Sequence, residues 1–213
     1  MAVPSDNSPP NSFSNLSHHT GEGVIIDIGT GDGHFVYQSA RENPNKFYIG
    51  IDANVRPLEK ISEKIHRKPA KGGAPNVLFI QATVEDLPAE LNGVASEVHV
   101  HFPWGSLLKA VAIGESDVLS RIRNICEDNA LFEIVFGLDP ERDARELKRL
   151  QISPLTFDFI DQVLTIRYRE AGFELLERGI VAANEWPEFK STWAKRLKGA
   201  VNRPLTYLIF QAT

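Results

Sequence analysis

Apolar residues along the chain gather in short runs that alternate with longer amphipathic segments. The run at residues 24–28, Val-Ile-Ile-Asp-Ile, has the nearly continuous apolar character of a strand buried on both faces of a sheet. Similar runs, some of them alternating apolar with polar residues, predict further strands at residues 46–51, 77–81, 96–101, 131–136, 173–181 and 205–211.

Helical spacing separates several of these strands. In the helix expected at residues 55–66, apolar side chains share one face and Pro57 is tolerated in the first turn. That face consists of Val55, Leu58, Ile61 and Ile65. Other helical segments are expected at residues 34–41, 139–150 and 159–171, with a short helix or structured loop at 185–198.

Strands that alternate with helices predict an α/β fold, with a mostly parallel sheet covered by helices on both faces. Residues 1–22 are rich in Ser, Pro and Asn and are expected to form a flexible N-terminal tail. Residues 23–213 are expected to form one domain, with inserted segments near 139–157 and 184–203.

Composition narrows the class of protein. Hydrophobic residues make up 42% of the 213 residues and charged residues 24%, a balance typical of soluble globular proteins and not of collagen, coiled coils or disordered chains. We find no apolar run of the roughly 20 residues that a membrane span needs, and no signal-peptide core. Cys126 is the single cysteine, so an internal disulfide is impossible. We expect a cytoplasmic protein.

Charge is unevenly distributed. The net charge of −5 argues against a protein that coats nucleic acid, because phosphate binding is mainly electrostatic. Residues 56–71, however, carry +4 and residues 190–203 carry +5, so the rest of the chain sums to −14. Two interpretations follow: a basic face on an acidic body, or ordinary solvated helix faces.

A glycine-rich turn follows the first strand. Residues 27–33 read Asp-Ile-Gly-Thr-Gly-Asp-Gly, and such glycines allow a sharp turn and close packing of a ligand on the main chain. Asp52, at the end of the next strand, can accept both hydroxyl hydrogens of a ribose. Asp27 needs a cationic or donor partner if it is buried. This pattern resembles the S-adenosylmethionine site of class I methyltransferases; the alternative is a glycine turn that binds nothing.

The ends of the third and fourth strands carry further candidates. In class I methyltransferases the region of residues 81–88 borders the adenine, where Glu85 would lie near the exocyclic amine; alternatively Glu85 is a helix N-terminal charge. Residues 101–108 read His-Phe-Pro-Trp-Gly-Ser-Leu-Leu, at a strand end where α/β sheets bind ligands. There Trp104 would hold a base swung out of its stack, unless it is a core aromatic.

A second tryptophan lies late in the chain among cations, in the segment 191–197, Ser-Thr-Trp-Ala-Lys-Arg-Leu. Trp104 and Trp193 could sandwich a flipped base while Lys195, Arg196 and Arg203 hold phosphates. The alternative is a helix that buries Trp193 on its apolar face.

Four segments together resemble one family: residues 27–33, 61–73 (ISEKIHRKPAKGG), 102–108 (FPWGSLL) and 193–197 (WAKRL). The glycine turn alone is a weak signal, but its combination with the other three is specific. From about residue 24 to 203 the chain is similar to the aminoglycoside-resistance 16S rRNA methyltransferases of the kanamycin–apramycin type, which modify N1 of the decoding-site adenine.

This resemblance implies a class I S-adenosylmethionine-dependent methyltransferase, Rossmann-like, with a seven-stranded sheet. It implies S-adenosyl-L-methionine as cofactor, S-adenosyl-L-homocysteine as product, 16S rRNA within the 30S subunit as partner, and Trp104 and Trp193 as the catalytic clamp. The expected cofactor-binding residues are Asp27, Gly29, Gly31, Asp52, Val84, Glu85, His101, Phe102, Pro103, Trp104, Gly105, Ser106, Ser191, Thr192 and Trp193. The expected RNA-binding residues are Lys64, Arg67, Lys68, Lys71, Lys195, Arg196 and Arg203.

Alternative functions remain open at this point. They are a tRNA guanine-N7 methyltransferase-like enzyme, a small-molecule methyltransferase, and an inactive relative that binds cofactor or RNA. We expect a monomer with neither a membrane partner nor a metal. His101 is expected to be a wall of the pocket rather than an acid or base.

Overall fold

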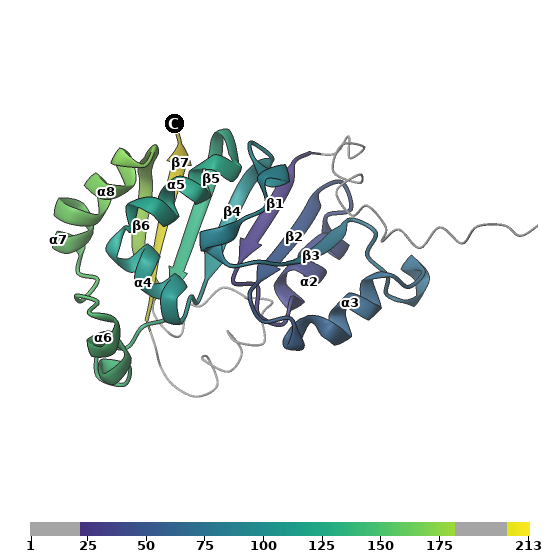
Figure 1. Cartoon of the computed structure of the whole chain (residues 1–213), viewed down its shortest axis with the longest axis horizontal. Helices are drawn as coiled ribbons and strands as arrows, with labels where there is room; N and C mark the ends of the chain where they lie inside the picture. Colours follow the sequence, from purple (N-terminus) through teal and green to yellow (C-terminus); the bar gives the residue numbers. More distant parts are fainter. Residues whose placement is uncertain (1–21, 182–203) are drawn as a thin grey trace, which may run out of the picture.

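The computed structural model of the chain describes residues 22–181 and 204–213, and seven of their segments form one sheet (Figure 1). The strands β1 to β5 are parallel, and β7 is antiparallel to both β5 and β6. The order across the sheet is β3-β2-β1-β4-β5-β7-β6. The strand bounds are β1 Val24–Ile28, β2 Phe47–Asp52, β3 Val77–Gln81, β4 Ala95–His101, β5 Cys126–Phe136, β6 Phe173–Val181 and β7 Leu205–Ala212. The expected mostly parallel, seven-stranded α/β sheet is therefore confirmed.

Helices cover both faces of the sheet, as expected. Helices α2 (His34–Glu42) and α3 (Glu59–Ile65) bury apolar side chains on one face, over β1, β2 and β3. Helices α4 (Gly105–Ile113), α5 (Ser116–Ile125) and α8 (Thr165–Glu170) bury theirs on the other face. The other helices within the described residues are α6 (Ala144–Leu150) and α7 (Phe157–Phe159), with short turns at η1 Arg56–Leu58, η2 Pro69–Lys71, η3 Val84–Asp86, η4 Ala89–Leu91 and η5 Ile160–Leu164.

Alternation along β1 divides its side chains between two hydrophobic cores. Ile26 and Ile28 join the larger core under α4, α5 and α8, while Ile25 joins the core under α2 and α3. Asp27 shares the face of Ile25, because successive side chains of a strand point to opposite faces. This places a carboxyl group on the α2 side of the sheet, one residue before the chain leaves the strand.

The amphipathic stripe predicted for residues 55–66 is wrong at its first position. Leu58, Ile61 and Ile65 are buried, but Val55 is 38% exposed. The segment starts as the 3₁₀ turn η1, for which Val55 is the N-cap residue. A 3₁₀ turn has about 3.0 residues per turn, so the 3.6-residue spacing assumed for Val55 does not hold there.

Two helices, α4 and α5, occupy residues 105–125, to which the sequence analysis assigned no element. Helix α4 contains Leu107, Leu108, Ala110, Val111 and Ala112 in close succession, so its apolar residues do not form a single stripe. Strand β5 also begins five residues earlier than expected, at Cys126 instead of 131. Its first part is exposed and polar and contains Asn129 at φ 66°, a pattern that resembles a loop in sequence.

The helix expected at residues 159–171 is a composite of α7, a π-helical turn and α8. In the π turn, the Thr165 hydroxyl donates to the carbonyl of Ile160, five residues earlier, at 2.9 Å. The helix expected at 139–150 begins only at Ala144. Before it, the Asp139 carboxylate accepts the amides of Glu141 and Arg142, which favours a turn.

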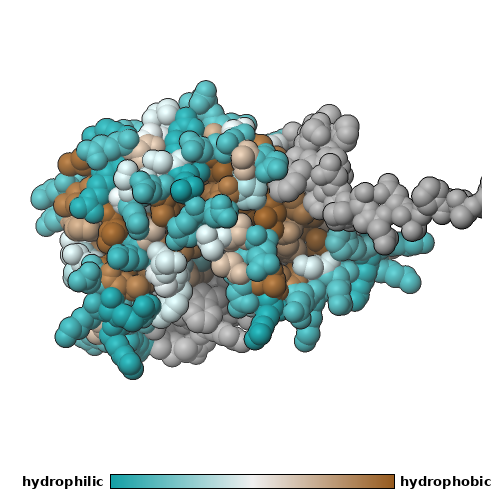
Figure 2. All heavy atoms as spheres, viewed as in Figure 1, coloured by the Kyte–Doolittle hydropathy of each residue, from teal (hydrophilic) through white to brown (hydrophobic). Residues whose placement is uncertain are grey.

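The surface mixes polar and apolar residues. On the face drawn in Figure 2, brown apolar residues are interspersed with teal hydrophilic ones. Within residues 22–181 and 204–213, we find no helix with the length and apolar character that crossing a membrane requires.

Tyr168 provides a test of how α8 is fixed to the sheet. Its side chain is fully buried, its ring stacks on Phe210 with centroids 4.2 Å apart, and its hydroxyl donates to the Val111 carbonyl at 2.9 Å. Tyr168→Phe should lower the free energy of unfolding by about 1–3 kcal/mol, because it leaves a buried carbonyl without its donor. Urea denaturation measures this.

The matched control is Tyr207→Phe. Tyr207 donates to Glu177 at an exposed position, so its loss should change stability by no more than about 0.5 kcal/mol. Equal effects of the two substitutions would contradict the assigned role of the buried hydroxyl.

Candidate functional site

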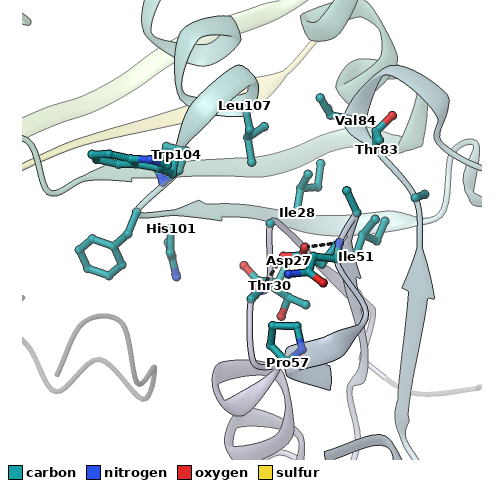
Figure 3. Close-up of a pocket in the computed structure, with 18 of the residues that line it drawn as sticks. Asp27, Ile28, Thr30, Ile51, Pro57, Thr83, Val84, His101, Trp104 and Leu107 are labelled. Carbon is teal, nitrogen blue, oxygen red and sulfur yellow. Dashed lines mark hydrogen bonds between the residues drawn. The ribbon is translucent and has the colours of Figure 1, made fainter. Parts of the chain in front are cut away.

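A cavity of about 770 Å³ opens at the carboxyl ends of β1, β2, β3 and β4. It lies where β1 is flanked by β2 on one side and β4 on the other, the switch point at which open α/β sheets bind ligands. In Figure 3, Trp104 lies on one side of the cavity, Thr83 and Val84 lie on the other, and Asp27 and Thr30 lie between. All four strand ends identified from the sequence thus meet at one site.

Most of the expected cofactor residues line this cavity. Gly105 lies between two lining residues, and Ser191, Thr192 and Trp193 lie outside the described part of the chain. The expected residues that line it are Asp27, Gly29, Gly31, Asp52, Val84, Glu85, His101, Phe102, Pro103, Trp104 and Ser106.

The glycine turn has the backbone geometry that requires glycine. Gly29, Gly31 and Gly33 have φ of 77°, 60° and 69°, a region that other residues rarely adopt. The amides of Gly29 and Thr30 both donate to the Ile51 carbonyl, which holds the turn against β2. A Cβ on Gly31 would meet no atom within 4 Å, so beside this backbone the cavity has room for a ligand.

Asp52 joins two loops of the cavity. One carboxylate oxygen accepts the Gly31 amide and the other accepts the Asn54 amide, both at 2.8 Å. These bonds fix the carboxylate where it lines the cavity, and each oxygen keeps a second lone pair. The arrangement fits the vicinal hydroxyls of a ribose, the role expected from the sequence.

Asp27 is buried, with 3% of its surface exposed. Burial raises the pKa of its carboxyl group above the ordinary value, and the nearby imidazoles of His101 and His99 act in the opposite direction. A side-chain hydrogen bond from Thr30 also lowers this pKa, so the partners expected for a buried Asp27 are the two β4 histidines and Thr30. Glu85 lies in the first turn of η3, as its interpretation as a helix N-terminal charge requires, and also lines the cavity; its place beside an adenine stays a prediction.

Sequence reasoning missed a network of charged side chains beside Asp27. His99 and His101 of β4 contact Glu133 of β5, and Glu97 contacts both His99 and Lys46. Burial lowers the pKa of His99, but hydrogen bonds to Glu133 and Glu97 outweigh it and raise the pKa to about 9. A hydrogen bond to His99 lowers the pKa of Glu97 to about 2. The alternation Glu-Val-His-Val-His in residues 97–101 was the available signal.

The loop after β4 presents Trp104 to the cavity. Phe102 has φ 51°, unusual for a bulky residue, and its amide donates to the Val135 carbonyl at 2.8 Å. Trp104 is the N-cap residue of α4 and is 51% exposed. The alternative that Trp104 is a core aromatic is therefore wrong, because half of the residue is open to a ligand at the rim.

The basic segment of residues 56–71 starts at the cavity. Pro57 lines it, and Arg67, Lys68 and Lys71 farther along are exposed. Lys64 is partly buried, with its ammonium nitrogen 4.4 Å from the centroid of the Tyr37 ring. The remaining expected RNA-binding residues, Lys195, Arg196 and Arg203, lie outside the described residues.

The family model and the curated relatives that match this chain name the same family. The family model described as NpmA, 16S rRNA (adenine(1408)-N(1))-methyltransferase, matches residues 8–212. The 16S rRNA (adenine(1408)-N(1))-methyltransferase of Streptoalloteichus hindustanus is 36% identical over 180 residues, 84% of this chain and 82% of that protein.

Two crystal structures are similar over nearly the whole chain. The aminoglycoside resistance methyltransferase NpmB1 has a TM-score of 0.81 and 44% identity, covering 94% of this chain and 93% of its own. A mutant 16S rRNA (adenine(1408)-N(1))-methyltransferase from Catenulisporales acidiphilia, crystallised with its cosubstrate SAM, has a TM-score of 0.85 and 30% identity, covering 97% and 92%.

The tRNA guanine-N7 methyltransferases, an alternative left open by the sequence, match less of the chain. A tRNA (guanine-N(7)-)-methyltransferase of Bacillus cytotoxicus is 34% identical over 84 residues, which cover 38% of this chain and 37% of that protein. The NpmA-type model, by contrast, spans both the cavity and the basic segments. The resemblance stated from the sequence is confirmed: the chain belongs to the 16S rRNA (adenine(1408)-N(1))-methyltransferase family.

Proposed function

We propose that this protein transfers a methyl group from S-adenosylmethionine to N1 of the decoding-site adenine of 16S rRNA in the 30S subunit, and thereby confers aminoglycoside resistance. One observation carries the proposal. A half-exposed tryptophan, Trp104, stands at the rim of the same cavity whose floor holds the glycine turn and Asp52. A cofactor site and a surface for an extruded base are thus adjacent.

The cofactor would be held by groups from each strand end. Asp52 would accept the ribose hydroxyls, the turn at Gly29 and Gly31 would pack against the ligand through its main chain, and Val84 and Glu85 would border the adenine. When bound, S-adenosylmethionine supplies a methyl group on a positively charged sulfur. Gly105, Ser191, Thr192 and Trp193 belong to the same proposed set by the family resemblance.

Methyl transfer to adenine N1 does not require a general acid or a general base. Adenine N1 carries a lone pair and no proton, so its attack on the methyl group needs no general base. The residues have to align the base and exclude water. Positive charge develops on the adenine, and a tryptophan face stabilises a nearby cation by roughly 0.5–2 kcal/mol. Trp104 is therefore suited to the reaction electrostatically as well as by shape, and Trp193 is its proposed partner.

Docking would use the basic segments. Arg67, Lys68 and Lys71 are exposed on the segment that begins at the cavity mouth, where they would contact phosphates and orient the subunit. Lys64 would contribute more weakly, because its ammonium group already lies over Tyr37. We propose that Lys195, Arg196 and Arg203 also contact the RNA. We further propose that the protein is a cytoplasmic monomer and that the segments near residues 139–157 and 184–203 are insertions in the methyltransferase domain.

The experiment that tests the function compares substrates side by side. Transfer of a labelled methyl group from S-adenosylmethionine should be seen with 30S subunits and be absent with tRNA and with small-molecule acceptors. Label on tRNA would support a tRNA guanine-N7 methyltransferase, and label on small molecules would support a small-molecule methyltransferase. Cofactor binding without transfer to any acceptor would indicate an inactive relative.

Asp52 provides a test of the cofactor site. Asp52→Ala should weaken S-adenosylmethionine binding by about 1.5–3 kcal/mol, the scale of hydrogen bonds to a charged group. Isothermal titration calorimetry measures it. Asp117→Ala, the same change at an exposed position of α5, is the matched control and should bind like wild type. Unchanged affinity in Asp52→Ala would remove the carboxylate from the site.

The tryptophan and the basic segment provide a test that separates chemistry from docking. Trp104→Ala should slow methyl transfer at least tenfold, since stacking is worth roughly 1–3 kcal/mol per base and about 1.4 kcal/mol corresponds to a decade in rate. Trp104→Phe should retain more activity because it keeps an aromatic face. Affinity for 30S subunits should change far less.

Charge reversal at Arg67 and Lys68 should have the complementary effect. This double variant should lose affinity for 30S subunits while its affinity for S-adenosylmethionine stays unchanged, because phosphate contacts position the RNA without forming the pocket. Single-turnover rates and filter binding measure the two effects. Full activity in a folded Trp104→Ala protein, or wild-type 30S binding by the charge-reversed protein, would contradict the assignment. Trp193→Ala should behave like Trp104→Ala.

A further inference from the structure

Three side chains with metal-binding atoms converge beside the cavity. His99 and His101 are two residues apart on β4, so they project from the same face of the strand. Glu133 lies on β5 in register with His99. The donor atoms of all three lie within 4.8 Å of one another, the one such group of three in the described part of the chain.

Two of the three distances between donor atoms match a tetrahedral metal site. Zinc binds imidazole nitrogen and carboxylate oxygen at about 2.0–2.2 Å, so two ligand atoms of a tetrahedral site lie about 3.3–3.5 Å apart. His99 Nδ1 is 3.3 Å from His101 Nε2 and 3.4 Å from Glu133 Oε1. His101 Nε2 and Glu133 Oε1 are 2.6 Å apart, a hydrogen bond that a bound ion would replace.

The outer contacts of His99 also suit a metal ligand. Its other ring nitrogen, Nε2, is 3.4 Å from Glu97 Oε2, and Glu97 is in turn held by Lys46 Nζ at 2.8 Å. Metal-binding histidines usually pair their second nitrogen with a carboxylate or carbonyl, which fixes the ring orientation. His99 is therefore already held with Nδ1 directed at His101 and Glu133.

Burial and access fit a small ion. The side chains of His99 and His101 are 16% and 9% exposed, and that of Glu133 is 33% exposed. The Phe35 ring packs against both imidazoles, with centroids 5.5 and 4.9 Å away. An ion could enter past Glu133 and would then be shielded by an aromatic wall. Rigid neighbouring strands supply all three ligands.

We propose that His99, His101 and Glu133 form a binding site for a divalent transition metal ion, with Zn²⁺ as the preferred ion and a fourth coordination position left for water. Two imidazoles and one carboxylate favour zinc, cobalt or nickel over magnesium or calcium, which prefer all-oxygen sites. The proposal departs from our sequence-based expectation of no metal and does not depend on the proposed methyl transfer. A bound ion would link β4 to β5 three residues before Trp104.

The test is metal titration of the full chain after treatment with a chelator. It is done at pH 8, where a binding metal ion must displace the proton of His99, whose pKa is raised to about 9. Wild type should bind one equivalent of Zn²⁺ by calorimetry. Co²⁺ at the same site should give the visible absorption of a tetrahedral complex. Glu133→Gln, close to isosteric, and His99→Gln should weaken Zn²⁺ binding at least a hundredfold, and Glu97→Gln about 10–100-fold as an outer contact.

The matched control replaces three histidines outside the cluster in one variant, His18→Ala/His19→Ala/His66→Ala, and should bind Zn²⁺ like wild type. Thermal unfolding gives a second measurement: Zn²⁺ should raise the Tm of wild type and control but not that of Glu133→Gln. Absence of binding by wild type would overturn the proposal, as would binding that survives Glu133→Gln and disappears in the control. The cluster would then be a hydrogen-bonded ion network alone. Should the substituted proteins not fold, anomalous scattering from a Zn²⁺-soaked wild-type crystal decides.

Discussion

The candidate site depends on the parallel pairing of β1 with β2 on one side and β4 on the other. Parallel strands end at the same edge of the sheet, and the connections of neighbouring strands on either side of β1 run in opposite directions. The strand order by itself therefore creates a crevice beyond the carboxyl end of β1. The glycine turn, Asp52, the loop of Val84 and Glu85, and the Trp104 loop all enter this crevice because each follows a strand end.

Acidic and basic side chains are separated between the crevice and the segment that follows it. The carboxylates of Asp27 and Asp52 line the cavity, while the exposed cations Arg67, Lys68 and Lys71 follow on the segment that starts at Pro57. The acidic lining favours a positively charged cofactor, and the adjoining basic segment favours a polyanionic RNA. The net charge of the whole chain does not show which ligands such a surface attracts. The distribution of charge over a few tens of residues does.

The sequence was sufficient to predict β1, β2, β3, β4, β6 and β7, because their apolar or alternating runs are bounded by turn-forming or charged residues. It was insufficient for α4, whose apolar residues do not keep to one face, and for the exposed start of β5. Composition also could not decide whether Trp104 is buried; its 51% exposure follows from the turn at Phe102. The contact of His99 with Glu133 required the register between β4 and β5, which a single sequence does not contain.

Phe102 shows how the antiparallel half of the sheet supports the site. A bulky residue at φ 51° costs about 1–3 kcal/mol, and burial of a phenylalanine side chain returns roughly 1.5–3 kcal/mol. Phe102 is buried with Val135 of β5 and Leu205 of β7, and its amide is held by the Val135 carbonyl. The strained turn that directs Trp104 to the cavity rim is thus stable only while β5 and β7 pack beneath it. Two strands that contribute no residue to the cavity lining therefore set the position of the surface on which the base would stack.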